Sequence, residues 1–451
     1  MSFTDIILFP FYVLIFHLIF SARRKRINDP ILKRYHKQGF WIKVFSSVAF
    51  TIFFVYLTSG DSTSLYFPEG QHLYELILKD PAKNIHLLFG PGSNYDENFL
   101  KDTYNSGYFR LESNFFISRL VAILAFFTLG KYLLINLCFS MISYSGVWRL
   151  YRFFYEHYPQ LHKKLAIAII YLPTFIFWSS GILKDPICTG MLGWMTYSLY
   201  CIFEKRQSII KNLVITLIAA YILYIVKVYI IISYLPFYVL YLVLRNINRV
   251  KNTFGKIAIG IVIIFFCIIG LFALADKLTE DLGNFALDKI TESVKTQQTN
   301  FINMSDQAES SFSLGVEYDG SVTSLLKIAP AAIAATFFRP YLWESKKIST
   351  LLSSLESLAL ILFTLYVFFK AGPLKFFTTL FTNSMVFFCF FYSVIFAIFV
   401  GATTLNFGTL VRYKVPCLPF YIIALFLILE AAIIAKKNAL KAALLVETEP
   451  N

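Results

Sequence analysis

Long apolar runs separated by short polar connectors recur along the whole chain. Many of the runs approach the ~20 residues that an α-helix needs to cross a bilayer, and none has the alternating pattern of a membrane β-strand. The pattern predicts an all-α polytopic membrane helix bundle with about 11 transmembrane helices. The predicted spans are residues 4–20, 40–58, 132–152, 165–181, 186–203, 208–225, 228–245, 254–275, 350–369, 376–400 and 415–435.

Basic residues concentrate in connectors between these runs. The densest is "SARRKRINDPILKRYHK" at 21–37, and further basic connectors lie at 149–164, 204–207, 245–252 and 436–441. Connectors on the cytoplasmic side carry an excess of Lys and Arg. We therefore predict a multi-pass protein of a bacterial inner membrane, with its N-terminus outside, its C-terminus inside and its active face periplasmic or extracellular.

Two apolar runs, 114–130 and 325–338, do not fit this orientation as crossings. We predict that both are interfacial or re-entrant helices on the outer face, where protein or water satisfies their backbone groups. One would belong to a first outer loop over 59–131 and the other to a second outer loop over 276–349. No internal repeat is evident, so residues 1–451 are predicted to form a single integral membrane domain.

Composition supports the membrane class and narrows the set of partners. Hydrophobic residues make up 57% of the 451 residues and charged residues only 15%, where a soluble domain has about a quarter. The net charge of +14 lies in the connectors, which fits membrane orientation and gives no reason to expect a nucleic-acid partner. The six cysteines show no CxxC spacing and the six histidines no HExxH motif, so neither a disulfide framework nor a zinc site is predicted.

Placing an ionisable side chain inside a membrane costs free energy, so each such residue is a candidate for a functional role. Carboxylates can act as a general base or hold a metal, and Arg and Lys can bind phosphate. The alternative is that such residues only reach into the lipid headgroups or form ion pairs. The predicted orientation places the following candidates on the outer face: Asp96, Glu97, Lys184, Asp185, Lys227, Arg339, Glu344, Arg412 and Lys414.

The pair Lys184-Asp185 lies in an apolar stretch, between Gly181 and Pro186. Pro186 would begin a helix at a favourable first position, and Asp185 would then be its N-cap. A cation beside a positive helix end is unfavourable, so Lys184 needs another explanation. We predict that Lys184 points towards a phosphate in an outer cavity and that Asp185 both caps the helix and fixes the lysine.

Several short motifs occur in an order typical of one family. They are "NYDENFLKDTYNSGYF" (94–109), "YLPTFIFWSSGILKDPI" (171–187) and "VRYKVPCLPF" (411–420). Over about residues 40–205 and 405–435 the chain resembles the GT-C superfamily of membrane glycosyltransferases, and it is also similar to membrane proteins of bacterial polysaccharide loci. It departs from the GT-C pattern at Leu100, where a tyrosine is usual, and in its extra helix at 4–20.

The resemblance implies a GT-C-like fold and an inverting transfer of sugar from a polyprenyl-phosphate donor to a glycan, lipid or protein. Asp96 would be the base, assisted by Glu97 or a divalent metal such as Mg²⁺ or Mn²⁺, and Arg412, Lys184 and Arg339 would neutralise the leaving phosphate. Two alternatives stay open. One is a polysaccharide polymerase or O-antigen-ligase-like enzyme that uses a lipid pyrophosphate oligosaccharide. The other is a transporter or flippase without chemistry, although transporters more often show internal repeats.

Overall fold

The computed structural model describes residues 3–90, 109, 111–246, 312, 314, 322–345, 348–404 and 406–447. Within these residues, every regular element is a helix. Seven of these helices are long and apolar enough to cross a membrane. The prediction of an all-α membrane protein is therefore confirmed. By chain contacts the protein divides into two units, Met1–Ile231 and Ile232–Asn451, and each is described by itself.

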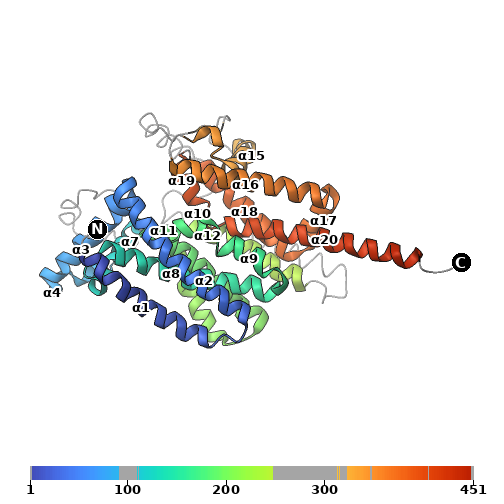
Figure 1. The fold of residues 1–451 in the computed structure, drawn as a ribbon. Coiled ribbons are helices and arrows are strands. Elements are labelled where there is room, and N and C mark those ends of the chain that lie inside the picture. The colour runs from blue at the N-terminus through green and yellow to red at the C-terminus, as the bar shows by residue number, and fades with distance from the viewer. Residues whose placement is uncertain are drawn as a thin grey trace. The chain divides into compact units, whose positions relative to one another are not determined.

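The first unit runs from blue to green in Figure 1. It contains α1 (Phe3–Lys25), α2 (Pro30–Ile52), α3 (Phe67–Lys79), α4 (Pro81–Asn84), α7 (Glu112–Thr128), α8 (Tyr132–His157), α9 (His162–Ile169), α10 (Pro173–Trp178), α11 (Lys184–Tyr200) and the larger part of α12 (Ile209–Asn246). Single turns of π-helix lie at Phe53–Leu57, Ser62–Tyr66 and Cys201–Lys205, and 3₁₀ turns at Ile85–Leu88 and Pro159–Leu161.

The second unit contains the end of α12 and the later helices. These are α15 (Val322–Phe338), α16 (Ile348–Ala371), α17 (Pro373–Thr382), α18 (Ser384–Thr403), α19 (Phe407–Tyr413) and α20 (Leu418–Glu447), with a 3₁₀ turn at Leu342–Glu344. The boundary between the units falls inside α12, so the predicted single domain over 1–451 stays a prediction.

Five predicted spans correspond one to one with α1, α2, α8, α16 and α20, whereas a continuous helix over 376–400 is wrong, because Asn383 ends α17 and caps α18. The two predicted spans at 208–225 and 228–245 correspond to the two segments of α12, whose 38 residues break at Lys227 (φ −154°, ψ 80°). A continuous helix over 165–181 is wrong. Pro173 holds Leu172 in an extended conformation and separates α9 from α10.

Three further predictions concern shorter or undescribed segments. The span predicted at 186–203 corresponds to α11, whose 17 residues rise only about 26 Å at 1.5 Å each. The span at 254–275 lies outside the described residues. The two runs predicted not to span form α7 and α15, of 17 residues each, and neither is among the seven long apolar helices.

Helix starts follow local sequence rules where they can be read. Asp29 caps α2, because its carboxylate accepts hydrogen bonds from the Ile31 and Leu32 amides at 2.7 and 3.2 Å, and Pro30 occupies the first turn. Asn383 caps α18 in the same manner through its side-chain oxygen. These caps satisfy backbone donors that a helix cannot pair internally.

Helix α8 forms the centre of the first unit, and it lies beside α1 and α2 in Figure 1. In the most apolar stretch of α8, 83% of the residues are buried, against 17% in that of α1. Glycines allow α8 and α11 to approach closely, because a Cβ on Gly146 would lie 1.8 Å from the Gly190 carbonyl oxygen and one on Gly193 2.0 Å from that of Gly146. Small residues at such a crossing are typical of membrane helix pairs.

Aromatic side chains form much of the core of the second unit. Tyr234 at the end of α12 lies 5.3 Å from both Phe388 and Tyr392 of α18, measured between ring centroids. Phe420 of α20 completes the group at 4.9 Å from Tyr392. The edge-on geometry of these contacts is favourable for aromatic pairs.

Candidate functional site

The turn between α10 and α11, residues 179–183, is held on two sides. Gly181 packs against Phe50 of α2, so closely that a Cβ would lie 2.1 Å from the ring. The Ile182 amide donates to the side-chain oxygen of Asn136 on α8 at 2.8 Å. A side chain at 181 would overlap the Phe50 ring. These two contacts hold the turn, which leads into Lys184 and Asp185, against α2 and α8.

The structure corrects the predicted roles of Lys184 and Asp185 in this turn. Helix α11 begins at Lys184, its N-cap is Leu183, and no side chain caps it. Asp185 therefore lies in the first turn and is not the N-cap. The Lys184 ammonium donates to the Ser113 hydroxyl of α7 at 2.9 Å, so Asp185 is not the residue that holds Lys184.

Asp185 instead pairs with Lys227, the residue at which α12 breaks. The Lys227 Nζ lies 2.5 Å from the Asp185 Oδ1, and the two side chains are 5% and 0% exposed. A negative side chain in the first turn also complements the positive end of α11. Lys227 was predicted to bind phosphate, but in this conformation its charge is neutralised inside the unit by a buried carboxylate.

A second buried cation, Arg119, lies near the middle of α7. Its Nε donates to the Leu87 carbonyl at 3.0 Å, another nitrogen donates to the Gly90 carbonyl, and Nη1 pairs with Glu112 at 2.6 Å. Burial lowers the pKa of Arg119 to about 10, which still leaves it charged at neutral pH. We name the following residues the α7–α11 cluster: Glu112, Ser113, Arg119, Lys184, Asp185 and Lys227.

Asp96 and Glu97 lie outside the described residues. The chain on either side of them is described, however, and both flanks contact α7. Gly90 accepts a hydrogen bond from Arg119, and Phe109, which is 1% exposed, lies 6.5 Å from Phe115 between ring centroids. Both ends of the segment that carries the acidic pair are therefore fixed beside the α7–α11 cluster.

In the second unit, Arg339 and Glu344 form a two-pronged ion pair. The Arg339 Nε lies 3.0 and 3.1 Å from the two Glu344 carboxylate oxygens. The guanidinium also lies 4.4 Å from the Phe312 ring and 5.2 Å from the Phe407 ring. A phosphate would have to compete with Glu344 for this arginine, which weakens its predicted role as a phosphate ligand.

Lys414 and Arg412 lie at the end of α19. Lys414 is 2% exposed and donates to the Ser357 hydroxyl at 3.4 Å and, at 3.5 Å, to the Arg339 carbonyl. Burial lowers the pKa of Lys414, against the opposing effect of Glu356. Arg412 is half-buried with its guanidinium 5.4 Å from the Tyr413 ring. In the second unit, the structure thus brings Lys414 beside the Arg339–Glu344 pair.

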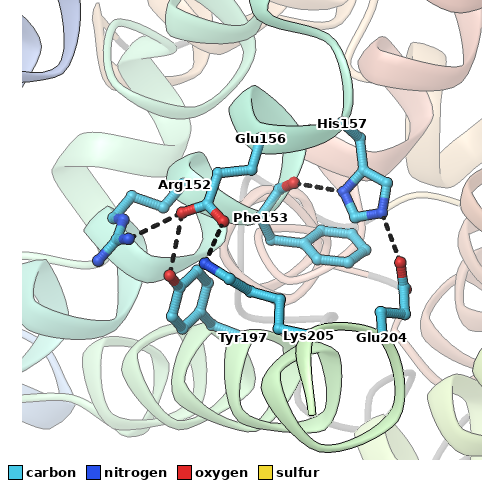
Figure 2. Close-up of polar contacts among 7 residues, drawn as sticks. All are labelled: Arg152, Phe153, Glu156, His157, Tyr197, Glu204 and Lys205. Atoms are coloured by element: carbon cyan, nitrogen blue, oxygen red, sulfur yellow. Dashed lines mark hydrogen bonds and ion pairs between the residues drawn. The ribbon is translucent and has the colours of Figure 1, made fainter. Parts of the chain in front are cut away.

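A third polar group joins the far ends of α8 and α11 (Figure 2). The Glu156 carboxylate accepts from Arg152 at 2.8 Å, Tyr197 at 3.0 Å and Lys205 at 2.8 Å. Beside it, His157 contacts the Phe153 carbonyl at 2.7 Å and Glu204 at 3.0 Å. This group lies among the predicted cytoplasmic connectors and ties two helix ends together.

The sequence analysis missed Lys43 and Arg119, both of which are buried. Each is a single cation within an apolar run, and that position was the available signal. In the described part of the chain, no group of three His, Cys, Asp or Glu side chains is placed to hold a metal ion. Comparisons with protein-family models, curated proteins and solved structures return no match to this chain.

Proposed function

We propose that the protein is a membrane glycosyltransferase that moves a sugar from a polyprenyl-phosphate donor to a glycan, lipid or protein acceptor on the outer face of the membrane. The observation that carries this proposal is the position of Lys184. Its ammonium lies at the start of α7, where both flanks of the segment with the acidic pair are fixed.

Chain length limits how far the acidic pair can be from this lysine. Asp96 follows Gly90 by six residues, and six residues of extended chain reach at most about 22 Å. This limit is consistent with a proposed site that takes its base and its phosphate-binding cation from the first unit. Transfer needs both, because the acceptor loses a proton while the leaving phosphate gains charge.

In the proposed reaction, the Asp96 carboxylate takes the proton from the acceptor hydroxyl. The acceptor oxygen forms a bond to the anomeric carbon as the bond from that carbon to the phosphate oxygen breaks. The configuration at the carbon inverts, and polyprenyl phosphate leaves with the bonding electrons. Lys184 binds the leaving phosphate, and Glu97 supports the base. A Mg²⁺ or Mn²⁺ ion, if one takes part, would be held by the acidic pair and would supply positive charge beside the phosphate.

The remaining candidates have narrower roles. The Asp185–Lys227 pair fixes the first turn of α11 against α12, which makes Asp185 a positioning residue. In the second unit, Arg412 remains the candidate phosphate ligand, since Arg339 is paired with Glu344 and Lys414 is buried. The membrane lipid itself is the expected second partner, because the donor carries a polyprenyl chain.

Purified protein in lipid nanodiscs would test the proposal with a labelled sugar on undecaprenyl phosphate. We expect Asp96→Asn to lower turnover about 10²–10⁴-fold, as loss of a general base does. Lys184→Met should weaken donor binding about tenfold or more, whereas Lys79→Met, an exposed lysine at the end of α3, should leave it unchanged. Full turnover by Asp96→Asn, or unchanged donor affinity of Lys184→Met, would contradict the proposed roles.

One observation favours a second candidate, a transporter or flippase. A buried ion pair at the break of a long apolar helix is a feature of membrane transport proteins. Movement of intact lipid-linked sugar across vesicles, without any new glycosidic bond, would support that candidate. Transfer of a whole oligosaccharide from a lipid pyrophosphate would instead identify a polymerase or ligase.

A further inference from the structure

Lys43 lies in the middle of α2 and is 3% exposed. Its Nζ contacts four oxygens: the Ser179 carbonyl and hydroxyl at 2.5 Å each, the Ser180 hydroxyl at 3.1 Å and the Ser143 hydroxyl at 3.3 Å. Among the described residues, no carboxylate forms an ion pair with it. A lysine so deep in an apolar helix is costly unless its donors are satisfied.

The hydrogen bonds of the surrounding hydroxyls determine what the Lys43 amine must do. The Ser179 hydroxyl donates to the Phe175 carbonyl at 2.5 Å, and the Ser180 hydroxyl donates to the Ile176 carbonyl at 2.6 Å. Both serine oxygens are therefore left as acceptors towards Lys43. An ammonium group, with three donors and no acceptor, fits this set of oxygens.

A second route connects Lys43 to the same helix start. The Ser143 hydroxyl lies 3.1 Å from that of Thr189, which donates to the Asp185 carbonyl at 2.9 Å. Lys43 thus contacts the turn before α11 directly and reaches the first turn of α11 through Ser143. The direct route ends at Ser179 and Ser180, which precede Lys184 in the chain, and the second route ends at Asp185, the residue after it.

We propose that Lys43 is a positioning residue, whose ammonium fixes the 179–183 turn and thereby the place of Lys184 and Asp185. Its link to catalysis rests on the proposed function, but its effect on the turn does not. The reason to expect a function for this lysine is energetic, because burying an amino group without an ion-pair partner costs free energy that an apolar residue at this position would not cost. What such a replacement removes here is the polar attachment of the turn to α2, while the packing of Gly181 on Phe50 remains.

Hydrogen exchange of the full-length protein in nanodiscs, followed by mass spectrometry, reads the turn directly. In Lys43→Met we expect the amides of residues 181–189 to exchange about tenfold faster or more, with the thermal midpoint within a few degrees of the parent. Lys43→Arg should restore part of the protection because it returns the charge and donors. Ser46→Ala is the matched control, since Ser46 also lies on α2 but donates to Ile176 of α10, at 3.3 Å.

Two results would overturn the inference. One is unchanged exchange of 181–189 in a folded Lys43→Met protein. The other is a uniform rise throughout α2, α8 and α10, which would indicate general stabilisation. If Lys43→Met does not fold, Ser180→Ala removes one of the four oxygens and is judged by the same two criteria.

Binding of undecaprenyl phosphate, measured on the same proteins, separates this inference from the proposed function. Weaker binding in Lys43→Met, with normal binding in Ser46→Ala, supports both. If even the parent does not bind the lipid phosphate while exchange at 181–189 still rises locally in Lys43→Met, the proposed function fails and the positioning role stands. Normal binding together with unchanged exchange in Lys43→Met removes the positioning role alone.

Discussion

The clearest quantitative prediction concerns Glu69, whose side chain is buried on α3, a helix that packs against α7. The side chain is 6% exposed, and its Oε1 has no hydrogen-bond partner among the described residues. The helices are close here, because a Cβ on the neighbouring Gly70 would lie 2.5 Å from Val121. This burial raises the pKa of Glu69 from 4.5 to about 7.

The direction of the pH dependence follows from proton binding. Between pH 4.5 and about 7 the folded protein holds a proton on Glu69 that the unfolded chain has released. The free energy of unfolding is therefore greatest below pH 4.5 and falls as pH rises through about 7. At about 1.4 kcal/mol per pH unit, the whole effect is about 3 kcal/mol.

Glu69→Gln keeps the shape of the side chain and removes its titration. We expect the parent to lose on the order of 5–10 °C of thermal midpoint between pH 5 and pH 8 in detergent, relative to the variant. The midpoint of Glu69→Gln at pH 8 should accordingly exceed that of the parent. Thermal melts at half-unit steps of pH, on parent and variant together, make the comparison.

Glu75→Gln is the control, because Glu75 lies on the same helix but is exposed and bonds to Gln71 at 3.0 Å. It should leave the pH profile of the parent unchanged. Equal slopes for the parent and Glu69→Gln would refute the argument, since a carboxyl in water would then be the better description of Glu69.

Two other outcomes are expected. Asp185→Asn or Lys227→Met alone should destabilise the protein by about 3–5 kcal/mol by leaving one buried charge unpaired, while the double variant should recover much of the loss in thermal melts; an additive double variant would count against the pairing. Single cysteines at Lys79 and Lys33, in a cysteine-free background, should respectively react and not react with an impermeant maleimide added outside, and the reverse pattern would invert the predicted orientation.

Apolar run length was enough to predict the class of the protein and the approximate position of most long helices. Run length did not predict where the backbone interrupts a helix inside an apolar run. The break at Pro173 was readable from the proline and the residue before it, and the break of α12 at Lys227 lies between the two spans that run length predicted. A charged residue between two apolar runs is equally compatible with a connecting turn and with a lysine whose carboxylate partner lies 42 residues earlier in the chain.

The candidate site was predicted in part. Sequence singled out Lys184 and Asp185 because charges are unusual in such an apolar stretch, and both lie at a helix start as expected. Their partners, Ser113 and Lys227, follow from tertiary packing, which a single sequence does not contain. Lys43 was overlooked for a related reason. Its four oxygens come from serines that look ordinary until α2, α8 and the 179–183 turn are placed together.

The close crossing of α8 and α11 bears on how this protein can change over evolutionary time. Even one added methyl group at Gly146 or Gly193 would overlap a main-chain oxygen of the partner helix. Lipid offers no hydrophobic penalty that would push the separated helices back together. Homologues are therefore expected to differ one by one at the exposed residues of α1 but to keep the glycines at 146, 190 and 193 together. These three glycines can then help to identify distant homologues.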